Sequence, residues 1–178
     1  MLCDRDGTLV ADVPYNGDPD RVRVLPGVAA GLARLRAAGV ALAVVSNQSG
    51  VARGMVTPAQ VTAVNRRVEE LLGPFAAVVW CPHDARDGCR CRKPRPGLVL
   101  DAAAHLAVPP ERCTVIGDIG ADVEAAEAAG ARGVLVPHRR TRRAEVDRAA
   151  AVAADFETAV DMVLKGVATS GDAWRASP

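Results

Sequence analysis

Three aspartates stand where they could share one cation. Asp4 and Asp6 are two residues apart, directly after an apolar start, and Asp118 follows the apolar run 114–116. Carboxylates brought close together repel each other unless a cation or a proton separates them. No histidine neighbours these residues in the chain, and oxygen donors alone favour a hard cation such as Mg²⁺. The pattern predicts an acidic magnesium site, although a lone Asp-x-Asp also fits an ordinary loop or a helix cap.

A second cluster combines sulfur and nitrogen ligands. Cys81, His83, Cys89 and Cys91 form the pattern Cys-x-His-x5-Cys-x-Cys within 11 residues. Three thiolates and one imidazole complete a tetrahedral Zn²⁺ site and leave no open position, so we expect the zinc to be structural. A chance group of free thiols is one alternative. A redox pair is another, and the absence of Cys-x-x-Cys argues against it.

The elements that must position these residues alternate between strands and helices. Short apolar, β-branched runs predict buried strands at 1–3, 40–45, 77–80, 114–116 and 133–136. Proline near the start and glycine after the end predict helices at 26–38, 57–72, 96–106, 121–129 and 157–164. This alternation predicts an α/β fold with a Rossmann-like parallel sheet and helices on both faces. We expect one domain over residues 1–166 and a flexible tail over 167–178.

The polar residues converge on one edge of this predicted sheet. Each of the first four strands is followed by an unusual polar residue, namely Asp4, Ser46, Cys81 and Asp118. In parallel sheets, ligands bind beyond the carboxyl ends of the strands. We therefore expect both clusters at this edge. His105 is interpreted as a helix-surface residue and His138 as a loop residue, and neither is assigned a catalytic role.

Composition narrows the class of protein. The chain has 178 residues, 24% of them charged, with a net charge of +1, which is typical of a globular protein. Aromatic residues make up only 3%, which argues against stacking on nucleic-acid bases. No run is long and apolar enough to span a membrane, and charged residues interrupt the start where a signal peptide would be apolar. We expect a cytoplasmic monomer without nucleic-acid or membrane partners.

Four motifs, taken together, resemble those of the haloacid dehalogenase superfamily. Asp-x-Asp-Gly-Thr at 4–8 is similar to the first motif, Ser46 to the second, and Lys93 in Arg-Lys-Pro to the third. Asp118 and Asp122, in Gly-Asp-x-x-x-Asp, resemble the fourth. The motifs occur in the family's order, and the resemblance covers about residues 2–137.

This resemblance implies a magnesium-dependent phosphatase with a covalent intermediate. Asp4 would be the nucleophile that forms an aspartyl-phosphate, and Asp6 would act as general acid and then as general base. Mg²⁺ would be held by Asp4, Asp118 and the backbone carbonyl of Asp6, and it would offset the negative charge of carboxylate and phosphate.

The resemblance also implies a phosphate-binding pair. Ser46 would donate a hydrogen bond to a phosphoryl oxygen, and Lys93 would add a positive charge. Asp122 would orient Lys93 or a magnesium-bound water. The four zinc ligands lie in the segment 81–91, which we call the zinc loop. Cys91 lies two residues before Lys93, so this loop would help to place Arg92 and Lys93. Loss of zinc should then cost activity as well as stability.

The zinc loop narrows the resemblance further. Residues 46–54 and 89–94 are similar to D-glycero-D-manno-heptose 1,7-bisphosphate 7-phosphatases and the related histidinol-phosphatases. Carried over position by position, this implies substrate contacts at Asp12, Val13, Pro14, Tyr15, Ser46, Asn47, Gln48, Ser49, Arg53, Arg92 and Lys93. Arg53 and Arg92 would suit a second phosphate, because an arginine guanidinium can donate two parallel hydrogen bonds to a phosphate. Ile119 stands where many of these enzymes have a lysine, so one cationic contact near the metal is missing.

The expected substrate is a small phosphorylated sugar, heptose 1,7-bisphosphate first of all. Segments 9–26 and 54–92 are too short for a large cap domain, so the site should be open. Histidinol phosphate, the 3′-phosphate of a polynucleotide, and a non-catalytic zinc-stapled binding module remain as alternatives. The basic run 139–143 is interpreted as a solvated loop, with an anion-attracting position at the site edge as the second interpretation.

Overall fold

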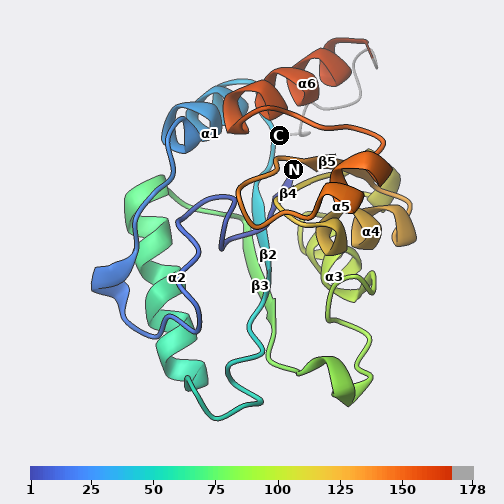
Figure 1. Ribbon diagram of the computed structural model, residues 1–178. Coiled ribbons are helices and arrows are strands. Elements are labelled where there is room, and N and C mark those ends of the chain that lie inside the picture. The colour runs from blue at the N-terminus through green and yellow to red at the C-terminus, as the bar shows by residue number, and fades with distance from the viewer. Residues whose placement is uncertain (170–178) are drawn as a thin grey trace.

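The computed structural model describes residues 1–169 and is built on one sheet of five parallel strands (Figure 1). These strands, in the spatial order β3-β2-β1-β4-β5, are β1 (Leu2–Cys3), β2 (Ala43–Asn47), β3 (Ala77–Cys81), β4 (Thr114–Gly117) and β5 (Arg132–Leu135). The central strand β1 pairs with both β2 and β4, so Leu2 lies opposite Ala43 and Val115. β2 and β3 lie on one side of β1, and β4 and β5 lie on the other, so the strand order reverses between β1 and β4. Ligands of such sheets bind at this switch point, beyond the carboxyl ends of the two strands.

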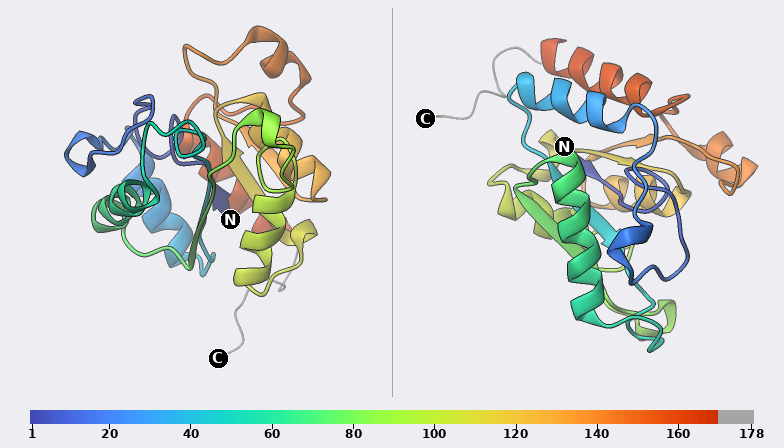
Figure 2. Two further views of the ribbon diagram at one scale, coloured as in Figure 1. Left: turned by 90° about the horizontal axis from the view of Figure 1, so that it is seen from below. Right: turned by 90° about the vertical axis from the view of Figure 1, so that its left-hand side faces the viewer.

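Helices cover both faces of the sheet (Figures 1 and 2). On one face lie α1 (Val28–Ala37), α2 (Pro58–Leu72) and α6 (Phe156–Thr169), in a core that includes Cys3, Val44 and Ile116. On the other face lie α3 (Gly97–His105) and α4 (Gly120–Ala128), in a core that includes Leu2, Val45 and Val115. Neighbouring strand residues point to opposite faces, so each continuous apolar run supplies both layers. The predicted α/β architecture is confirmed.

The start of α2 follows the local signals of the sequence. The backbone N–H of Gln60 donates to Oγ1 of Thr57 at 3.2 Å, and the N–H of Thr57 donates to Oε1 of Gln60 at 2.8 Å. This capping box satisfies two backbone donors that a helix start leaves unpaired. Pro58 occupies the first turn, where its missing N–H is not needed.

The predicted boundaries of β2 and β3 were wrong. β2 spans 43–47 instead of 40–45, because its pairing with β1 starts at Ala43 and its pairing with β3 continues to Asn47, opposite Cys81. Val40 and Leu42 are buried in the turn that leads into the strand. Ser46 and Cys81 therefore lie at the ends of strands and do not follow them.

The segment after β5 contains a helix that was not predicted. α5 (Arg143–Arg148) begins inside the basic run that we interpreted as a loop. Its first turn is capped because Oε2 of Glu145 accepts a hydrogen bond from the backbone N–H of Arg142 at 2.9 Å. Three short 3₁₀ turns complete the described elements: η1 (Pro19–Arg21), η2 (Ala85–Asp87) and η3 (Pro110–Arg112).

The last helix is longer than expected. α6 reaches Thr169, so residues 167–169 of the expected tail are helical, and residues 170–178 lie outside the described residues. Between β1 and α1 and between β2 and α2, the described chain forms only loops and η1, so no large cap domain is present there, as predicted. No helix within residues 1–169 is long and apolar enough to cross a membrane.

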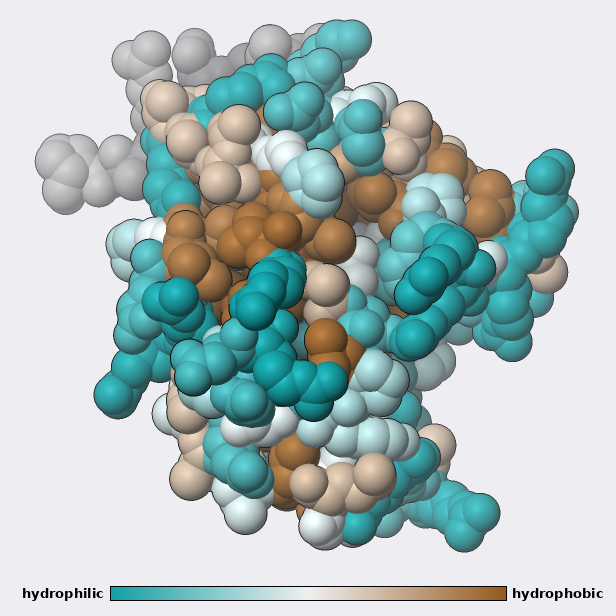
Figure 3. All heavy atoms as spheres, turned by 60° about the vertical axis from the view of Figure 1, so that its left-hand side comes forward, coloured by the Kyte–Doolittle hydropathy of each residue, from teal (hydrophilic) through white to brown (hydrophobic). Residues whose placement is uncertain are grey.

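Hydrophobic residues at the surface form a band below α1 on one face, among hydrophilic side chains (Figure 3). Across the described chain, the large exposed hydrophobic side chains come from separate segments: Tyr15, Met55, Leu71, Leu100, Ile119, Val152 and Met162. The monomeric state stays a prediction.

Candidate active site

Asp4 lies at the centre of the carboxyl edge of the sheet. Its backbone N–H donates to the carbonyl of Ile116 in β4 at 2.9 Å, so the residue continues the ladder between β1 and β4. Its carboxylate is almost fully buried and accepts a hydrogen bond from Nζ of Lys93 at 2.6 Å. Burial raises the pKa of Asp4 well above its usual range, the Lys93 ammonium opposes that shift, and neighbouring carboxylates add to it.

Lys93 is held from all sides. Its ammonium contacts Oδ1 of Asp4 at 2.6 Å, Oδ1 of Asp122 at 2.5 Å and the carbonyl of Val45 at 2.8 Å. Burial alone would lower the pKa of Lys93, but Asp122 and Asp4 outweigh it and raise the pKa, so the side chain stays a cation. The amide of Asn47 exchanges two hydrogen bonds with the Lys93 backbone, at 3.0 and 3.1 Å. Asn47, an expected substrate contact, thus fixes the loop that carries Lys93.

Asp118 completes the group of buried carboxylates. Its oxygens accept from Oγ1 of Thr8 at 3.2 Å and face Nε2 of His138 at 3.0 Å. Burial and Asp122 raise the pKa of Asp118 to about 6, against the opposing charge of His138. Gly7 has a φ of 88°, and a Cβ there would lie 2.5 Å from Oδ2 of Asp118. Only glycine allows the first loop to approach the carboxylate this closely.

These carboxylates fit a hard cation. One oxygen each from Asp4, Asp118 and Asp122 lies within 4.8 Å of the others, and all three residues are buried. Within this group, the Lys93 ammonium alone does not offset three carboxylates, and oxygen ligands suit Mg²⁺. The carboxylate of Asp6 lies outside the group, which leaves its backbone carbonyl as the expected ligand atom.

The Asp6 carboxylate is held by two other side chains. Its Oδ2 accepts from NH2 of Arg5 and from Nε2 of Gln48, both at 2.8 Å. The Gln48 amide also donates to Oγ of Ser46 at 2.8 Å. Gln48, an expected substrate contact, therefore links Asp6 to Ser46, the serine that we predicted to bind phosphate. Arg5 is 1% exposed, and its NH1 donates to Oδ1 of Asn65 on α2 at 2.6 Å.

Sequence reasoning missed Arg5, Asn65 and His138. Asn65 carried a readable signal, because it falls on the buried face of α2 marked by Val61, Val64 and Val68. His138 is a loop residue, as predicted, but its Nε2 lies 3.0 Å from Oδ2 of Asp118, so the expectation that no histidine lies near the carboxylates was wrong. His138 follows β5, whose carboxyl end lies at the same edge as that of β4.

The catalytic cavity has a volume of about 220 Å³ and gathers part of the predicted site. It is lined by Asp4, Asp6, Asp12, Ser46, Asn47, Lys93, Asp118, Ile119, Asp122, His138 and Arg140. The remaining predicted substrate contacts do not line it: Val13, Pro14, Tyr15, Gln48, Ser49, Arg53 and Arg92.

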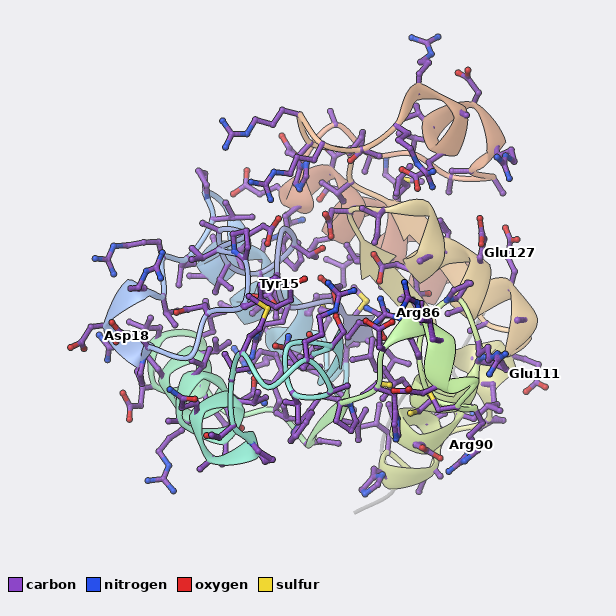
Figure 4. All side chains as sticks on the ribbon, turned by 60° about the horizontal axis from the view of Figure 1, so that its bottom comes forward. Tyr15, Asp18, Arg86, Arg90, Glu111 and Glu127 are labelled. Atoms are coloured by element: carbon purple, nitrogen blue, oxygen red, sulfur yellow. The ribbon has the colours of Figure 1, made fainter. Side chains whose placement is uncertain are left out.

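Tyr15 and Arg53 contact each other outside this cavity. NH1 of Arg53 donates to the Tyr15 hydroxyl at 2.5 Å, and Nε of Arg53 donates to Oδ2 of Asp84 at 2.6 Å. The Tyr15 ring packs against Gly50 in the turn after β2 and lies near the middle of this edge (Figure 4). Arg92 turns toward the zinc loop, where NH1 donates to the carbonyl of His83 at 3.3 Å.

The cysteine cluster assembles beside the acidic site. Sγ of Cys81 lies 3.5 Å from Nδ1 of His83, 3.6 Å from Sγ of Cys89 and 3.0 Å from Sγ of Cys91. Nδ1 of His83 lies 3.3 Å from Sγ of Cys91. All four ligand atoms lie within 4.8 Å of one another, and bonds of about 2.0–2.3 Å to one tetrahedral ion would produce a group of this size. The donor set fits Zn²⁺.

The zinc loop is joined directly to the loop of Lys93. The backbone N–H of Arg92 donates to Sγ of Cys89 at 3.4 Å, and the N–H of Gly97 donates to the carbonyl of Arg90 at 3.1 Å. A Cβ on Gly97 would lie 2.5 Å from that carbonyl oxygen. The loop therefore closes tightly between the cluster and α3, with Lys93 inside it. In the view from below, these loops face the reader at the carboxyl edge of the sheet (Figure 2).

Comparison with known proteins agrees with this geometry. A family model described as haloacid dehalogenase-like hydrolase matches residues 4–130, and a second, of HAD-hydrolase-like proteins, matches residues 90–171. The D-glycero-beta-D-manno-heptose-1,7-bisphosphate 7-phosphatase of Rhodopseudomonas palustris is 43% identical over 141 residues, which cover 73% of this chain and 78% of that protein. The protein of the same name from Escherichia coli K12 is 34% identical over 140 residues, with coverage of 72% and 73%.

A solved structure is similar over nearly the whole chain. The D,D-heptose 1,7-bisphosphate phosphatase from B. bronchiseptica, crystallised with magnesium and phosphate, superposes with a TM-score of 0.81 at 30% identity. The match covers 93% of this chain and 98% of that one.

Proposed function

The chain belongs to the haloacid dehalogenase-like hydrolases and is a phosphatase, and on this basis we propose that it removes the 7-phosphate of D-glycero-D-manno-heptose 1,7-bisphosphate with the help of Mg²⁺. The observation that carries the proposal is the buried contact of Asp4 with Lys93, beside Asp118, at the switch point of the sheet. A carboxylate in that position has a cation on one side and an open cavity on the other.

In the first step, a carboxylate oxygen of Asp4 attacks the phosphorus of the 7-phosphate. The bond between phosphorus and the sugar oxygen breaks, and Asp6 gives its proton to that leaving oxygen. Lys93 and Ser46 line the cavity and stabilise the negative charge on the transferred phosphoryl group. The products of this step are the dephosphorylated sugar oxygen and an aspartyl-phosphate on Asp4.

In the second step, water attacks the phosphorus of the aspartyl-phosphate. Asp6, now deprotonated, takes a proton from that water, and the bond between phosphorus and Asp4 breaks to release inorganic phosphate. The contacts of Asp6 with Arg5 and Gln48 support this role, because they hold the carboxylate in one place for both proton transfers.

The metals have separate roles in this proposal. Asp4, Asp118 and the backbone carbonyl of Asp6 would hold Mg²⁺, which supplies positive charge to the carboxylates and to the phosphoryl group. The role of Asp122 is to orient Lys93, because its carboxylate contacts the Lys93 ammonium at 2.5 Å. Cys81, His83, Cys89 and Cys91 would hold Zn²⁺ as a structural ion that shapes the loop of Lys93.

The substrate assignment rests on the relatives and on the shape of the site. Both relatives named above are heptose bisphosphate phosphatases, and the open edge without a large cap suits a small phosphorylated sugar. Tyr15, Arg53 and Arg92 form a polar rim where the substrate can make further contacts.

The proposal is tested by phosphate release in the presence of Mg²⁺. Heptose 1,7-bisphosphate should be hydrolysed with a kcat/KM orders of magnitude above that of histidinol phosphate, and Asp4→Asn should be inactive on both. If histidinol phosphate is the better substrate, the mechanism stands and the substrate is wrong. If Asp4→Asn keeps its activity, the catalytic assignment of Asp4 is wrong.

A further inference from the structure

We propose that Arg140 exchanges its ion pair with Asp12 for a second anionic group of the substrate, and that the cavity beyond this pair holds the leaving half of the substrate. The inference rests on the proposed phosphatase function and deepens it. It assigns a binding site to the loop between β5 and α5, which the sequence motifs did not include.

The catalytic cavity is small, and a larger cavity lies beside it. Sites for small molecules usually have volumes of about 300–1,000 Å³. The cavity that contains Asp4 has about 220 Å³, which is enough for a phosphoryl group but small for a whole sugar phosphate. A neighbouring cavity of about 400 Å³ is lined by Gly7, Ala11, Asp12, Leu25 and residues 138–140.

The two cavities share a wall. Asp12, His138 and Arg140 line both, so the ion pair between NH1 of Arg140 and Oδ2 of Asp12 lies on the boundary between them. Arg139 lines the second cavity as well. The positive side chains on this side match a phosphate or carboxylate, while Ala11 and Leu25 offer an apolar surface to the carbon skeleton.

The ion pair can be exchanged at little cost. The Arg140 side chain is 50% exposed and that of Asp12 is 32% exposed, and exposed ion pairs contribute little to stability. A phosphate accepts two parallel hydrogen bonds from a guanidinium and carries more charge than a carboxylate, so it competes well for Arg140.

The backbone beneath Arg140 is anchored to the catalytic residues. Oγ1 of Thr141 donates to the carbonyl of Asp118 at 2.6 Å, and the N–H of Arg140 donates to Nδ1 of His138 at 2.8 Å. Nε2 of the same His138 faces Asp118. The side chain of Arg140 is therefore free to change partner while its loop keeps a fixed distance from the phosphoryl site.

The cavity at the zinc loop is the competing location for the leaving half. It has about 220 Å³ and is lined by Arg92 among others, but it shares only Lys93 with the catalytic cavity. The Lys93 ammonium is already bonded to Asp4, Asp122 and Val45. The cavity beside Arg140 shares three lining residues with the catalytic cavity, whereas the cavity at the zinc loop shares one. This closer connection favours the cavity beside Arg140 as the location of the leaving half.

The test compares two sugars that differ by the second phosphate. Steady-state kinetics of the full-length, Mg²⁺-loaded enzyme are measured with heptose 1,7-bisphosphate and with heptose 7-phosphate. Arg140→Ala should raise KM for the bisphosphate about 10- to 100-fold, the value of a charge-assisted hydrogen bond, and change KM for the monophosphate less than about threefold. Arg143→Ala removes the same charge from the same basic run, outside both cavities, and should change neither.

For a second variant, we expect the opposite change in KM for the bisphosphate. Asp12→Asn removes the competing partner of Arg140, so KM for the bisphosphate should fall relative to KM for the monophosphate. The inference is overturned if Arg140→Ala affects both sugars equally, if Asp12→Asn raises KM for the bisphosphate relative to KM for the monophosphate, or if Arg92→Ala alone abolishes the preference for the bisphosphate. A wild-type enzyme that hydrolyses neither sugar would instead overturn the proposed function, and this inference with it.

Discussion

Asp6 owes its position to a chain of buried contacts that ends on α2. Arg5 bonds the Asp6 carboxylate on one side and Oδ1 of Asn65 on the other. A guanidinium that is 1% exposed is tolerated only when its donors are satisfied, because an unpaired buried charge is costly. Asn65 therefore fixes Arg5 and, through Arg5, the direction of Asp6. We therefore expect Asn65 to act as a positioning residue for Asp6.

Replacing Asn65 should show its effect in the dependence on the leaving group. In Asn65→Leu, Asp6 loses its fixed direction, so protonation of a poor leaving group slows. The kcat/KM for heptose 1,7-bisphosphate should fall about 10- to 100-fold, below the full value of general acid catalysis. An aryl phosphate such as p-nitrophenyl phosphate needs little protonation of its leaving oxygen, so its kcat/KM should change less than about threefold.

Asn65→Asp serves as the matched control, because it keeps an oxygen that can accept from Arg5. It should retain most of the activity on both substrates. Thermal unfolding of each variant separates a loss of folded protein from a loss of rate. An equal fall of kcat/KM for both phosphates in folded Asn65→Leu would show that the residue supports the fold only.

The residue scale also shows how far sequence reasoning reaches. Asp4 and Asp118 carry charges directly after apolar strands, so their position alone marked them as candidates, whereas Lys93 was selected through its resemblance to a family motif. Gln48 and Asn47 were selected as well, but for substrate contact. The structure instead bonds them to Asp6, Ser46 and the Lys93 backbone. Which partner an amide chooses depends on three-dimensional neighbours that spacing along the chain does not contain.

At the scale of elements, the zinc loop decides where Lys93 lies in the site. It leaves β3 at Cys81, returns at Cys91 and carries Lys93 into the centre of the acidic group. Among the described elements of this loop, only the 3₁₀ turn η2 is regular. A segment with so little secondary structure would depend on a bound metal for a defined shape.

Removal of zinc should therefore abolish catalysis and lower stability together. A chelator treatment followed by excess Mg²⁺ should yield protein with a lower Tm and little phosphatase activity, because Lys93 is no longer held beside Asp4. Activity should return on addition of Zn²⁺, with one zinc per chain by elemental analysis. Cys89→Ser should behave like the zinc-free protein, whereas Cys113→Ser, which changes a buried cysteine outside the cluster, should bind zinc normally. A zinc-free enzyme with normal kcat would contradict the assigned role of the loop.

Element boundaries depend on pairing partners more than on local pattern. Residues 40–45 read as one apolar run, yet β2 starts at Ala43 because β1 offers only Leu2 and Cys3 for pairing on that side. β2 then extends to Asn47 because β3 continues opposite it to Cys81. The helix α5 was missed for a similar reason. Its arginines have no apolar stripe, and the cap from Glu145 becomes visible only in the folded chain.

At the scale of the whole molecule, the parallel sheet explains why distant motifs could be joined from sequence. All strands end at the same edge, so residues after β1, β2 and β4 had to meet there. The loop after β5 meets the same edge, but its histidine and arginines did not form a recognisable motif. His138 and Arg140 reach the site because their loop leaves the carboxyl end of β5, and the hydroxyl of Thr141 donates to the carbonyl of Asp118.

The same convergence places the molecule under electrostatic strain. Asp4, Asp118 and Asp122 are buried within a few ångströms of one another, with the Lys93 ammonium in contact with two of them and the His138 ring beside the third. Burial and Asp122 raise the pKa of Asp118 to about 6, compared with about 3.9 for an unperturbed aspartate. Between these pH values the folded chain binds more protons at Asp118 than the unfolded chain does. Stability in the absence of Mg²⁺ should therefore fall as the pH rises from about 4 to above 6.

Asp118→Asn should both relieve the repulsion among the buried carboxylates and abolish the phosphatase activity. In Mg²⁺-free buffer near pH 7.5, with zinc retained, the variant should have a free energy of unfolding about 1–3 kcal/mol above that of the wild type, because one like charge leaves a buried group. The gain should become much smaller near pH 4, where the carboxyl of Asp118 is protonated in the folded wild type and about half protonated in the unfolded chain. Addition of Mg²⁺ should stabilise the wild type by mass action and leave the variant unchanged. Asp147→Asn, which removes a carboxylate paired with Arg143 on the surface, should show neither effect. Denaturant unfolding at the two pH values, with and without Mg²⁺, measures all of these differences, and a variant less stable than the wild type at pH 7.5 would show that the hydrogen bonds of Asp118 outweigh its repulsion.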